Sequence, residues 1–451
     1  MQHIVRAGTL GPQHHKGHVP LRFDVPAGVA SMRIFLTSHP ARATGAPFDN
    51  LLCLSLFGPD GPRGTRHNNP SKALSLDAFR ATPGFTPGPI EPGEWTVVLD
   101  AFRIIGPDPL DYRVEIMLSS EPVEPLAPRP LPALVDPGPG WYRGDLHAHS
   151  LHSDGRWDIP DLVASAKRRG LDFVTLTDHN TVSGLAQMDR LADAGILTMG
   201  GVELTTHYGH ALALGTRQWQ EWRAGSLAGV TMPGIAARVA AEGALFVIAH
   251  PMSPGDPACA GRRWEYADMR PGNAPAVEIW NGVWADYNEE GVAEYFAWLN
   301  EAWLGRGERL VATAGTDSHG PFDGRGRPGF NHVLAQGRTE RAILEAVAQG
   351  RNYLSSGPRL VIGAETTDRR KISMGGRASK GVAIVEVNWR NAGDARQLRL
   401  IGNGREAARQ SIDAEGSATF PARAGAKAWY LAELRDAKGE LHAITNPIFV
   451  G

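Results

Sequence analysis

Short apolar runs, interrupted by Gly, Pro and Asp, dominate the first 120 residues of the chain. They are LRFDV (21–25), SMRIFLTSH (31–39), LLCLSLFGPDG (51–61), EWTVVLDAFRI (94–104) and YRVEIML (112–118). Their length and β-branched content predict the antiparallel strands of a β-sandwich. From Pro122 to Pro139, seven of 18 residues are proline, a composition that cannot continue a helix or an inner strand. Residues 1–140 are therefore predicted to be an N-terminal β-sandwich with a Pro-rich linker at its end.

Beyond residue 140 the pattern changes to an alternation of strands and helices, an α/β arrangement. Short, mostly apolar runs predict buried strands at 171–177, 196–203, 244–250, 276–281 and 310–317. A helix is predicted after Asp158, the expected N-cap, with Pro160 in its first turn and Gly170 as its stop. A second helical pattern spans 339–349. Alternation over about 200 residues predicts a parallel (β/α) barrel in residues 141–359.

Strand texture returns near the C-terminus. The runs are VAIVEVNW (382–389), QLRLIG (397–402), SATFPA (417–422) and AWYLAELRD (428–436). They predict a second small β-sandwich in residues 360–451.

Composition excludes several classes of protein. The chain has 451 residues, of which 42% are apolar and 21% charged, which is ordinary for a globular protein with full cores. With 46 Lys and Arg against 48 Asp and Glu, the net charge of −2 offers no broad electrostatic surface for nucleic acid or an anionic membrane. Cys53 and Cys259 are too few for a disulfide framework or a cysteine zinc cluster.

The N-terminal segment has no apolar run of the length that a signal peptide needs. We therefore expect a soluble, cytoplasmic protein without membrane contact, although a chain whose leader had been removed would look the same. His14, His15 and His18 lie near the start of the chain, and we expect them in a mobile terminus rather than at a metal.

Chemistry-bearing residues gather where the predicted barrel strands end. Nine of the 16 histidines fall between residues 147 and 332. The polar strand ends are His147-Ala-His149, Asp178-His179-Asn180, Glu203, His250-Pro251 and Asp317-Ser318-His319. His147 and His149 stand at i and i+2, so in an extended strand both imidazoles point the same way and can reach one metal ion.

The carboxyl ends of the strands of a parallel barrel converge on one face. A single histidine at such an end is usually a structural residue. Five buried polar strand ends that point into one cavity need a common partner. A cluster of divalent metal ions supplies that partner.

The combined order of these motifs resembles the PHP (polymerase and histidinol phosphatase) metallohydrolases. It runs His-x-His, Ser-Asp-Gly, Thr-Asp-His-Asn, Glu, Gly-His, His-Pro, Asp-Ser-His. The segments 277–282, 315–319 and 350–358 further resemble the carbaryl-hydrolase-like (CehA/McbA-type) branch of that family. The resemblance covers roughly residues 142–360 and does not extend to the N-terminal sandwich.

The resemblance implies a distorted (β/α)7 PHP barrel that holds two or three divalent metal ions. The first ion would be bound by His147, His149, Glu203 and Asp317. The second would share Glu203 and add His250 and His210; His210 is preferred to His207 because it leads directly into an apolar strand. Asp154, His179 and His319 would hold a third ion. Because the family varies at the position of Asp154, these three residues are alternatively an acid that protonates the leaving group.

The implied ligands are imidazoles and carboxylates without thiolate, which suits zinc, manganese or iron and does not rank them. Two ions that share a carboxylate lower the pKa of a bridging water to about 7 and hold the substrate oxygen that accumulates charge. We therefore expect hydrolysis by a metal-bound hydroxide, with no covalent nucleophile on the protein.

Arginines near these motifs are candidates for binding an anionic substrate. Arg325 and Arg327 follow His319 on a glycine-rich loop, and Arg262 and Arg263 follow His250. Either pair could overhang the metal face and bind an anion in bidentate fashion, or could be solvated loop charges. At the end of the strand 276–281, Trp280 and Asn281 are further candidates, with Trp280 as an apolar wall.

The favoured function is a metal-dependent phosphoesterase acting on a small phosphomonoester or phosphodiester. A hydrolase of carbamates, esters or amides with an aromatic leaving group is the alternative that the branch resemblance favours. Two weaker alternatives are a carbohydrate- or partner-binding protein with an inactive barrel, and a polymerase-associated module acting on DNA ends. Every ligand position is filled, which argues against the first. No basic tract is present, which argues against the second.

Overall fold

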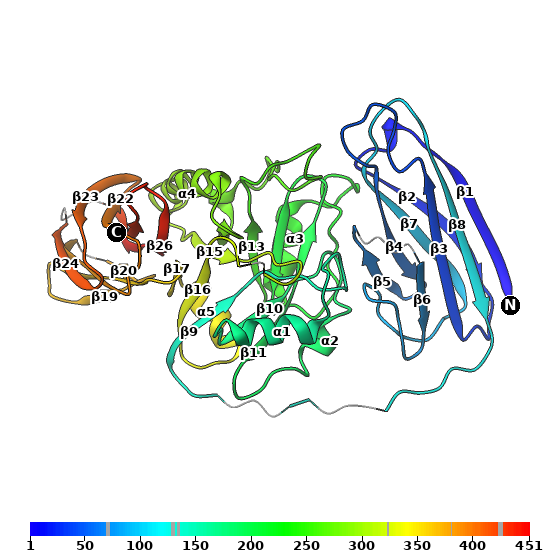
Figure 1. The fold of residues 1–451 in the computed structure, drawn as a ribbon, viewed down its shortest axis with the longest axis horizontal. Coiled ribbons are helices and arrows are strands. Elements are labelled where there is room, and N and C mark those ends of the chain that lie inside the picture. The colour runs from blue at the N-terminus through cyan, green and yellow to red at the C-terminus, as the bar shows by residue number, and fades with distance from the viewer. Residues whose placement is uncertain (69–72, 128–130, 133–135, 323, 380, 423–426) are drawn as a thin grey trace.

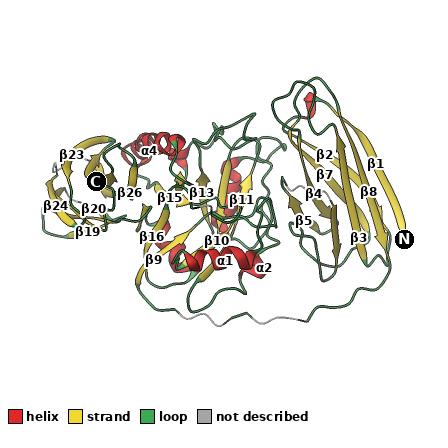
Figure 2. Ribbon diagram, viewed as in Figure 1, coloured by secondary structure: helices red, strands yellow, loops and turns green. Residues whose placement is uncertain are grey.

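The computed structural model describes residues 1–68, 73–127, 131–132, 136–322, 324–379, 381–422 and 427–451. Figure 1 shows three modules in a row. We call residues 2–119 the N-terminal module, 140–355 the central module and 359–450 the C-terminal module. In Figure 2 the longer helices gather around the central module, whereas strands and loops make up almost all of the other two.

The N-terminal module consists of two four-stranded antiparallel sheets, in the orders β1-β8-β3-β6 and β2-β7-β4-β5. Its strands are β1 (Gln2–Leu10), β2 (Gly17–Val25), β3 (Ser31–His39), β4 (Leu51–Gly58), β5 (Gly61–Arg66), β6 (Ala73–Asp77), β7 (Gly93–Arg103) and β8 (Leu110–Ser119). A short 3-10 helix spans Pro12–His14. Buried and exposed positions alternate along β3, so that Met32 and Ile34 pack with Trp95 in one core shared by both sheets.

The expectation of a mobile N-terminus was wrong. Residues 2–10 pair along their whole length with β8. His18 lies in β2, where Nδ1 is 2.6 Å from Asp100 Oδ1 and Nε2 is 2.8 Å from Ser226 Oγ of the central module. Because this edge strand is half exposed, residues 2–10 contain few apolar positions in alternation. The sequence pattern that predicts a strand is therefore weak here.

The central module contains all five strands expected at its core. Its strands are β9 (Gly140–Asp145), β10 (Phe173–Leu176), β11 (Leu197–Thr205), β12 (His210–Leu214), β13 (Leu245–Ala249), β14 (Ala276–Asn281), β15 (Val311–Gly315), β16 (Phe330–Ala335) and β17 (Asn352–Ser355). Every residue of β10, β11, β13, β14 and β15 is buried, as their apolar runs predict.

Helices cover these strands. They are α1 (Ile159–Arg168), α2 (Leu185–Met188), α3 (Met232–Ala241), α4 (Asp286–Leu299) and α5 (Glu340–Ala348), with a π-helical turn at Asn300–Arg306. The predicted start of α1 is confirmed, since the Asp158 carboxylate accepts the Ile159 N–H at 2.8 Å and Pro160 lies in the first turn. Gly170, with φ at +65°, follows the end of the helix.

The sheet of the central module is mixed rather than wholly parallel, which corrects the sequence-based expectation. Strands β9 to β15 are neighbours in chain order, and β12 runs antiparallel to both β11 and β13. Only four residues join β11 to β12, and so short a connection can join only antiparallel strands. The two ends of the series meet at a parallel bridge between Ala148 and Ser318. The (β/α)7 barrel with flanking sandwiches, and the limits 1–140, 141–359 and 360–451, stay predictions.

The C-terminal module is joined to the central sheet, which the sequence did not indicate. Its strands are β18 (Arg359–Thr366), β19 (Lys371–Ser373), β20 (Arg377–Ala378), β21 (Val382–Arg390), β22 (Gln397–Gly402), β23 (Arg405–Ser411), β24 (Gly416–Pro421), β25 (Ala428–Arg435), β26 (Leu441–Thr445) and β27 (Ile448–Val450). Pairing of β17 with β26 continues the central sheet into β25, β22 and β23. The sheet β19-β18-β21-β24 shares an apolar core with these strands.

The Pro-rich linker connects β8 to β9. Residues 128–130 and 133–135 of it lie outside the described residues, and its described residues contain neither helix nor strand. Elsewhere too, the described parts of the chain contain no helix that is long and apolar enough to cross a membrane.

Candidate metal centre

Two histidines directly follow β9 and are fully buried. The backbone here is paired with the segment after β15: the Asp317 N–H donates to the His147 carbonyl at 2.8 Å, and the His149 N–H donates to the Ser318 carbonyl at 3.0 Å. Because residues i and i+2 of an extended segment point to the same face, the two imidazoles meet, with their Nε2 atoms 3.1 Å apart. Asp317 Oδ1 lies 3.0 Å from Nε2 of His149.

Glu203, in β11, is completely buried at the centre of the cluster. Its Oε1 lies 3.0 Å from Nδ1 of His210 and 3.0 Å from Nε2 of His250. Its Oε2 lies 3.2, 3.3 and 2.9 Å from ring nitrogens of His147, His149 and His179. The two oxygens of one carboxylate therefore face two different groups of imidazoles, which is the arrangement that a bridging ligand requires.

A third group lies beside His149. Asp154 Oδ1 is 3.1 Å from Nε2 of His319 and 3.4 Å from Nε2 of His179. The ring of His149 stacks on both histidines, with centroids 4.3 Å from His179 and 4.2 Å from His319. This third group is therefore continuous with the first.

Ligand atoms within 4.8 Å of one another define four candidate ion sites. They are His147, His149, Glu203 and Asp317; Glu203, His210 and His250; His149, Asp154, His179 and His319; and His147, His250 and Glu278. The first three contain the residues that the family resemblance assigned to three separate ions.

The hydrogen bonding of these atoms fits a set of metal ligands. Glu203 Oε2 and Asp154 Oδ1 are buried and accept no hydrogen bond from any described residue, although imidazole nitrogens lie within ion-pair distance of both. A buried carboxylate oxygen without a hydrogen bond is costly. Metal ligands direct their lone pairs at the ion and not at one another, so a cation in each of these two groups would satisfy its carboxylate oxygen.

The protonation states of Glu203, His210 and His250 agree with metal binding. Burial alone would raise the pKa of Glu203, but the neighbouring His147, His179 and His210 hold it well below its usual range. Burial lowers the pKa values of His210 and His250 to about 4. The Glu203 carboxylate is therefore ionised and the His210 and His250 imidazoles are neutral at pH 7, as metal binding demands. The surrounding carboxylates instead raise the pKa values of His147 and His179, which must release a proton when an ion binds.

Two of the clustered residues have strained backbones. His250 and Asp317 have φ angles of +27° and +50°, in the left-handed region that residues other than glycine avoid. Such conformations cost on the order of 1–3 kcal/mol each and are retained mainly where function requires them. Here they turn the side chains at the ends of β13 and β15 into the cluster.

Glu278 is a member of the cluster that the sequence analysis missed. Its Oε1 lies 3.1 Å from Nδ1 of His147, and its Oε2 accepts the backbone N–H of His250 at 3.2 Å. The signal was present, because Glu278 is an acidic residue between the apolar Val277 and Ile279 of a buried strand. A carboxylate on the second ring nitrogen fixes which nitrogen of His147 faces the cluster.

The proposed arginine ligands are only partly placed at the cluster. Arg262 donates from Nη2 to Asp317 Oδ2 at 2.5 Å and to Asn281 Oδ1 at 2.9 Å. Arg263 instead pairs with Glu290 at 3.4 Å and is 43% exposed. Arg327 is turned toward the C-terminal module, where it pairs with Asp394 and Glu440. The assignments of Arg263 and Arg327 to substrate are therefore corrected.

The assignments at the end of β14 and in the loop after His319 are corrected as well. Trp280 is fully buried, where Gly329 and Trp284 cover its ring. Asn281 is also buried, and it orients Arg262. The described residues that line the cavity of the cluster do not include Trp280, Asn281 or Arg325.

The structure separates the two histidines that were alternatives. His210 faces Glu203. His207 lies away from the cluster among the rings of His18, Phe102 and Trp222, and neither of its ring nitrogens has a hydrogen-bond partner among the described residues.

The cluster opens into a cavity of about 240 Å³. Its described lining residues are Leu51, His67, Asn68, Arg103, Asp154, His179, Glu203, His210, His250, Ala258, Cys259, Ala260, Arg262, Asp317 and His319. The first four belong to the N-terminal module. The sequence analysis missed them, because no local pattern connects residues 51–103 with motifs that begin at residue 147.

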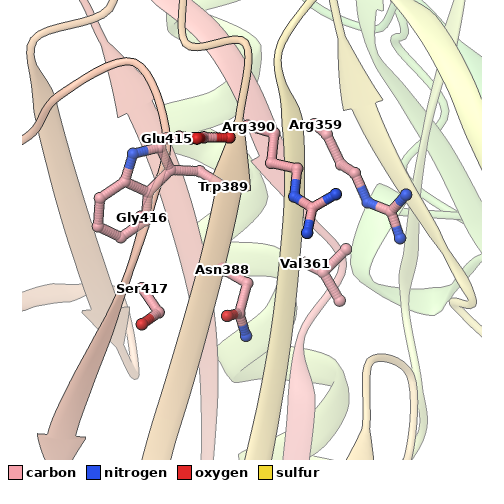
Figure 3. A pocket seen from close by; sticks show the side chains of 8 residues that line it. All are labelled: Arg359, Val361, Asn388, Trp389, Arg390, Glu415, Gly416 and Ser417. Carbon is pink, nitrogen blue, oxygen red and sulfur yellow. The ribbon is translucent and has the colours of Figure 1, made fainter.

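A larger hollow of about 740 Å³ lies on the C-terminal module (Figure 3). In that view Arg359 and Arg390 lie side by side, on strands β18 and β21. Its described lining residues include one carboxylate, Glu415, and no histidine. It therefore lacks the ligands of a metal centre, and the smaller cavity is the candidate site.

Part of the central module is similar to a known domain. Residues 145–241 match the PHP domain. The matched part begins at the end of β9 and includes His147, His149, Asp154, His179 and Glu203. The comparisons support a PHP domain and not the carbaryl-hydrolase-like branch, which stays a prediction.

Curated relatives share short segments with this chain. The Error-prone DNA polymerase of Symbiobacterium thermophilum is 44% identical over 72 residues, which are 15% of this chain and 7% of the polymerase. The 5'-3' exoribonuclease of Haemophilus influenzae is 37% identical over 65 residues, 14% of this chain and 24% of that protein. The chain thus spans less than a quarter of either relative.

Among solved structures, a two-domain protein of Bacteroides vulgatus is described as containing a predicted PHP-like metal-dependent phosphoesterase. The match covers 72% of this chain and 100% of that one, at 17% identity and a TM-score of 0.39.

Proposed function

We propose that this protein is a metal-dependent phosphoesterase whose divalent ions are bound at the cluster in the central module. One observation carries the proposal: Glu203 presents both carboxylate oxygens to five buried imidazoles, and Oε2 has no hydrogen bond from a described residue. The proposed ligands are His147, His149, Asp154, His179, Glu203, His210, His250, Asp317 and His319. The match to the PHP domain supports the same chemistry.

Bound divalent ions would supply Lewis acidity and lower the pKa of water to about 7. The remaining work falls to the chain's own residues. Glu278 orients His147 and His250, and Arg262 orients Asp317 while its guanidinium lines the cavity. A guanidinium at this position can bind the non-reacting oxygens of a phosphate ester.

His179 is placed to hold a proton. Burial would lower its pKa, but Asp154 and Glu203 raise it to about 10. With no ion bound, His179 is therefore protonated at pH 7, and its ring lines the cavity where it could donate this proton to a leaving oxygen.

Arg262 favours phosphate esters over neutral carbamates, because a cation in the cavity stabilises an anionic substrate. The carbamate hydrolase remains the second candidate only through the branch resemblance.

The experiment is metal analysis of purified protein, followed by assays of p-nitrophenyl phosphate, bis(p-nitrophenyl) phosphate and 1-naphthyl N-methylcarbamate. We expect at least two ions per chain and hydrolysis of a phosphate ester. Glu203→Gln should lose both shared ions and essentially all activity. Full metal content in this variant, or hydrolysis of the carbamate alone, would refute the proposal.

A further inference from the structure

The N-terminal module lies over the carboxyl ends of the central strands. In Figure 1 it stands on the side of the central module opposite to the C-terminal module. The linker between β8 and β9 comprises residues 120–139. Its length allows the module to cover the ends of the strands where the ligand cluster lies.

Polar contacts hold the module on two loops beside the cavity. Thr181 Oγ1, in the loop after β10, donates to the Gly84 carbonyl at 2.7 Å. Lys16 Nζ pairs with Asp256 Oδ2, in the loop after β13, at 2.7 Å. Both loops directly follow segments that carry proposed ligands, so these contacts place the module at a defined position relative to the cluster.

Residues of the module contact the cluster itself. The ring of His67 lies 4.7 Å from that of His179, and Asn68 Nδ2 donates to Asp154 Oδ2 at 3.4 Å. Leu51 and Arg103 line the same cavity. The N-terminal module is therefore one wall of the site.

Arg103 is held in that wall by main-chain carbonyls. It donates from Nε to Asp49 O at 2.7 Å and from Nη1 to Pro257 O at 2.8 Å. The described lining residues include two arginines, Arg103 and Arg262, and no lysine. The cavity of about 240 Å³ is smaller than the roughly 300–1,000 Å³ of sites for drug-sized ligands. It suits a small ester with an anionic group.

We propose that the N-terminal module determines substrate specificity, with Arg103 binding non-reacting phosphate oxygens and Leu51 limiting the size of the leaving group. The substrate class is a small phosphomonoester. This inference rests on the proposed phosphoesterase function. Arg103 and Leu51 are specificity-determining residues because they face the cavity from a module that contributes none of the proposed metal ligands.

The first test separates the charge of Arg103 from its structural role. Arg103→Gln keeps a hydrogen-bond donor and loses the charge, whereas Arg103→Lys keeps the charge. We expect Arg103→Gln to raise the KM for p-nitrophenyl phosphate and the Ki for inorganic phosphate by about 10–100-fold, since a charge-assisted contact to phosphate is worth about 1.5–3 kcal/mol. The kcat and metal content should stay near wild type, and Arg103→Lys should recover most of the binding.

The matched control is Arg22→Gln, on an exposed part of the same module, where Arg22 pairs with Glu94 at 3.7 Å. Equal KM and Ki values for Arg103→Gln and this control would overturn the proposal. So would a parallel loss of kcat and metal content in both Arg103 variants, because that pattern indicates only a structural role.

The second test enlarges the cavity. Leu51→Ala should raise the kcat/KM ratio for 1-naphthyl phosphate over phenyl phosphate by about tenfold, because a few methylene groups in an apolar pocket decide discrimination of that size. Leu21→Ala, at a half-buried leucine on the core of the same module, is the control. An unchanged ratio in Leu51→Ala would overturn the role of Leu51.

These tests distinguish failure of the inference from failure of the proposed function. If the metal-loaded wild type hydrolyses phosphate esters and the Arg103 and Leu51 variants match their controls, the function stands and the inference fails. If the wild type hydrolyses none, the function fails. Calorimetric binding of inorganic phosphate to wild type and Arg103→Gln then still decides whether Arg103 binds the anion.

Discussion

Replacing Glu278 with glutamine tests whether the buried carboxylate behind the cluster controls metal affinity. Glu278 Oε1 lies 3.1 Å from His147 Nδ1, and Oε2 accepts the N–H of His250. Glutamine keeps the shape and can still accept one hydrogen bond, but it loses the negative charge that makes the His147 imidazole a stronger donor to a metal. Loss of such a supporting partner typically weakens metal affinity by about 10–100-fold. That range corresponds to about 1.4–2.7 kcal/mol.

The assay is competition between the protein and a chelator of known affinity, with zinc or manganese as the ion. Asp100→Asn is the matched control, because Asp100 is a fully buried, hydrogen-bonded carboxylate in the N-terminal module, away from the proposed ligands. Glu278→Gln should weaken binding in this range, whereas Asp100→Asn should leave affinity near wild type even if it lowers the melting temperature. Wild-type metal affinity in a folded Glu278→Gln protein would refute the reasoning.

Three further predictions concern single side chains. His179→Ala should lower the metal content by one ion per chain if a third ion is bound; otherwise it should slow phenyl phosphate about 10²–10⁴-fold more than p-nitrophenyl phosphate, because the leaving oxygen of phenol is more basic. Unchanged metal content with equal slowing of both esters would exclude both roles. Arg262→Ala should lower kcat/KM for a phosphate ester about 10–100-fold. Arg327→Ala should leave kcat/KM unchanged and lower the free energy of unfolding by at most about 1 kcal/mol, because the ion pairs of Arg327 are exposed. Similar kinetics for these two variants would contradict the placement of the arginines. Burial lowers the pKa of His207 to about 2, so below pH 6.5 the unfolded chain binds a proton that the folded chain does not. This ring should therefore contribute about 2 kcal/mol of the stability lost between pH 7 and pH 5. The fall in melting temperature over this range should be smaller in His207→Leu, and an equal fall would show that His207 does not titrate in this way.

Local signals were sufficient where a residue's role depends on its neighbours in sequence. The apolar runs of β10, β11, β13, β14 and β15 predicted buried strands, because a strand covered on both faces needs apolar side chains throughout. The N-cap of α1 followed from Asp158 and Pro160 for the same local reason. The histidine and carboxylate motifs at strand ends likewise predicted the cluster, since strand direction alone brings those ends to one face.

Tertiary structure decided everything that depends on contacts between distant segments. Nothing near Arg327 in the sequence indicates that Asp394 and Glu440 pair with it, and nothing near Arg103 indicates that it lines the cavity. The joining of β17 to β26 is equally non-local, because any strand edge can pair with another and only the folded arrangement selects the partner. The sequence by itself therefore determined these five buried strands of the central module, and together with the family resemblance it indicated the proposed metal ligands. Only tertiary structure decided which residues line the cavity opposite the proposed ligands. These residues, Leu51, His67, Asn68 and Arg103, belong to the N-terminal module and are distant in sequence from the ligand motifs.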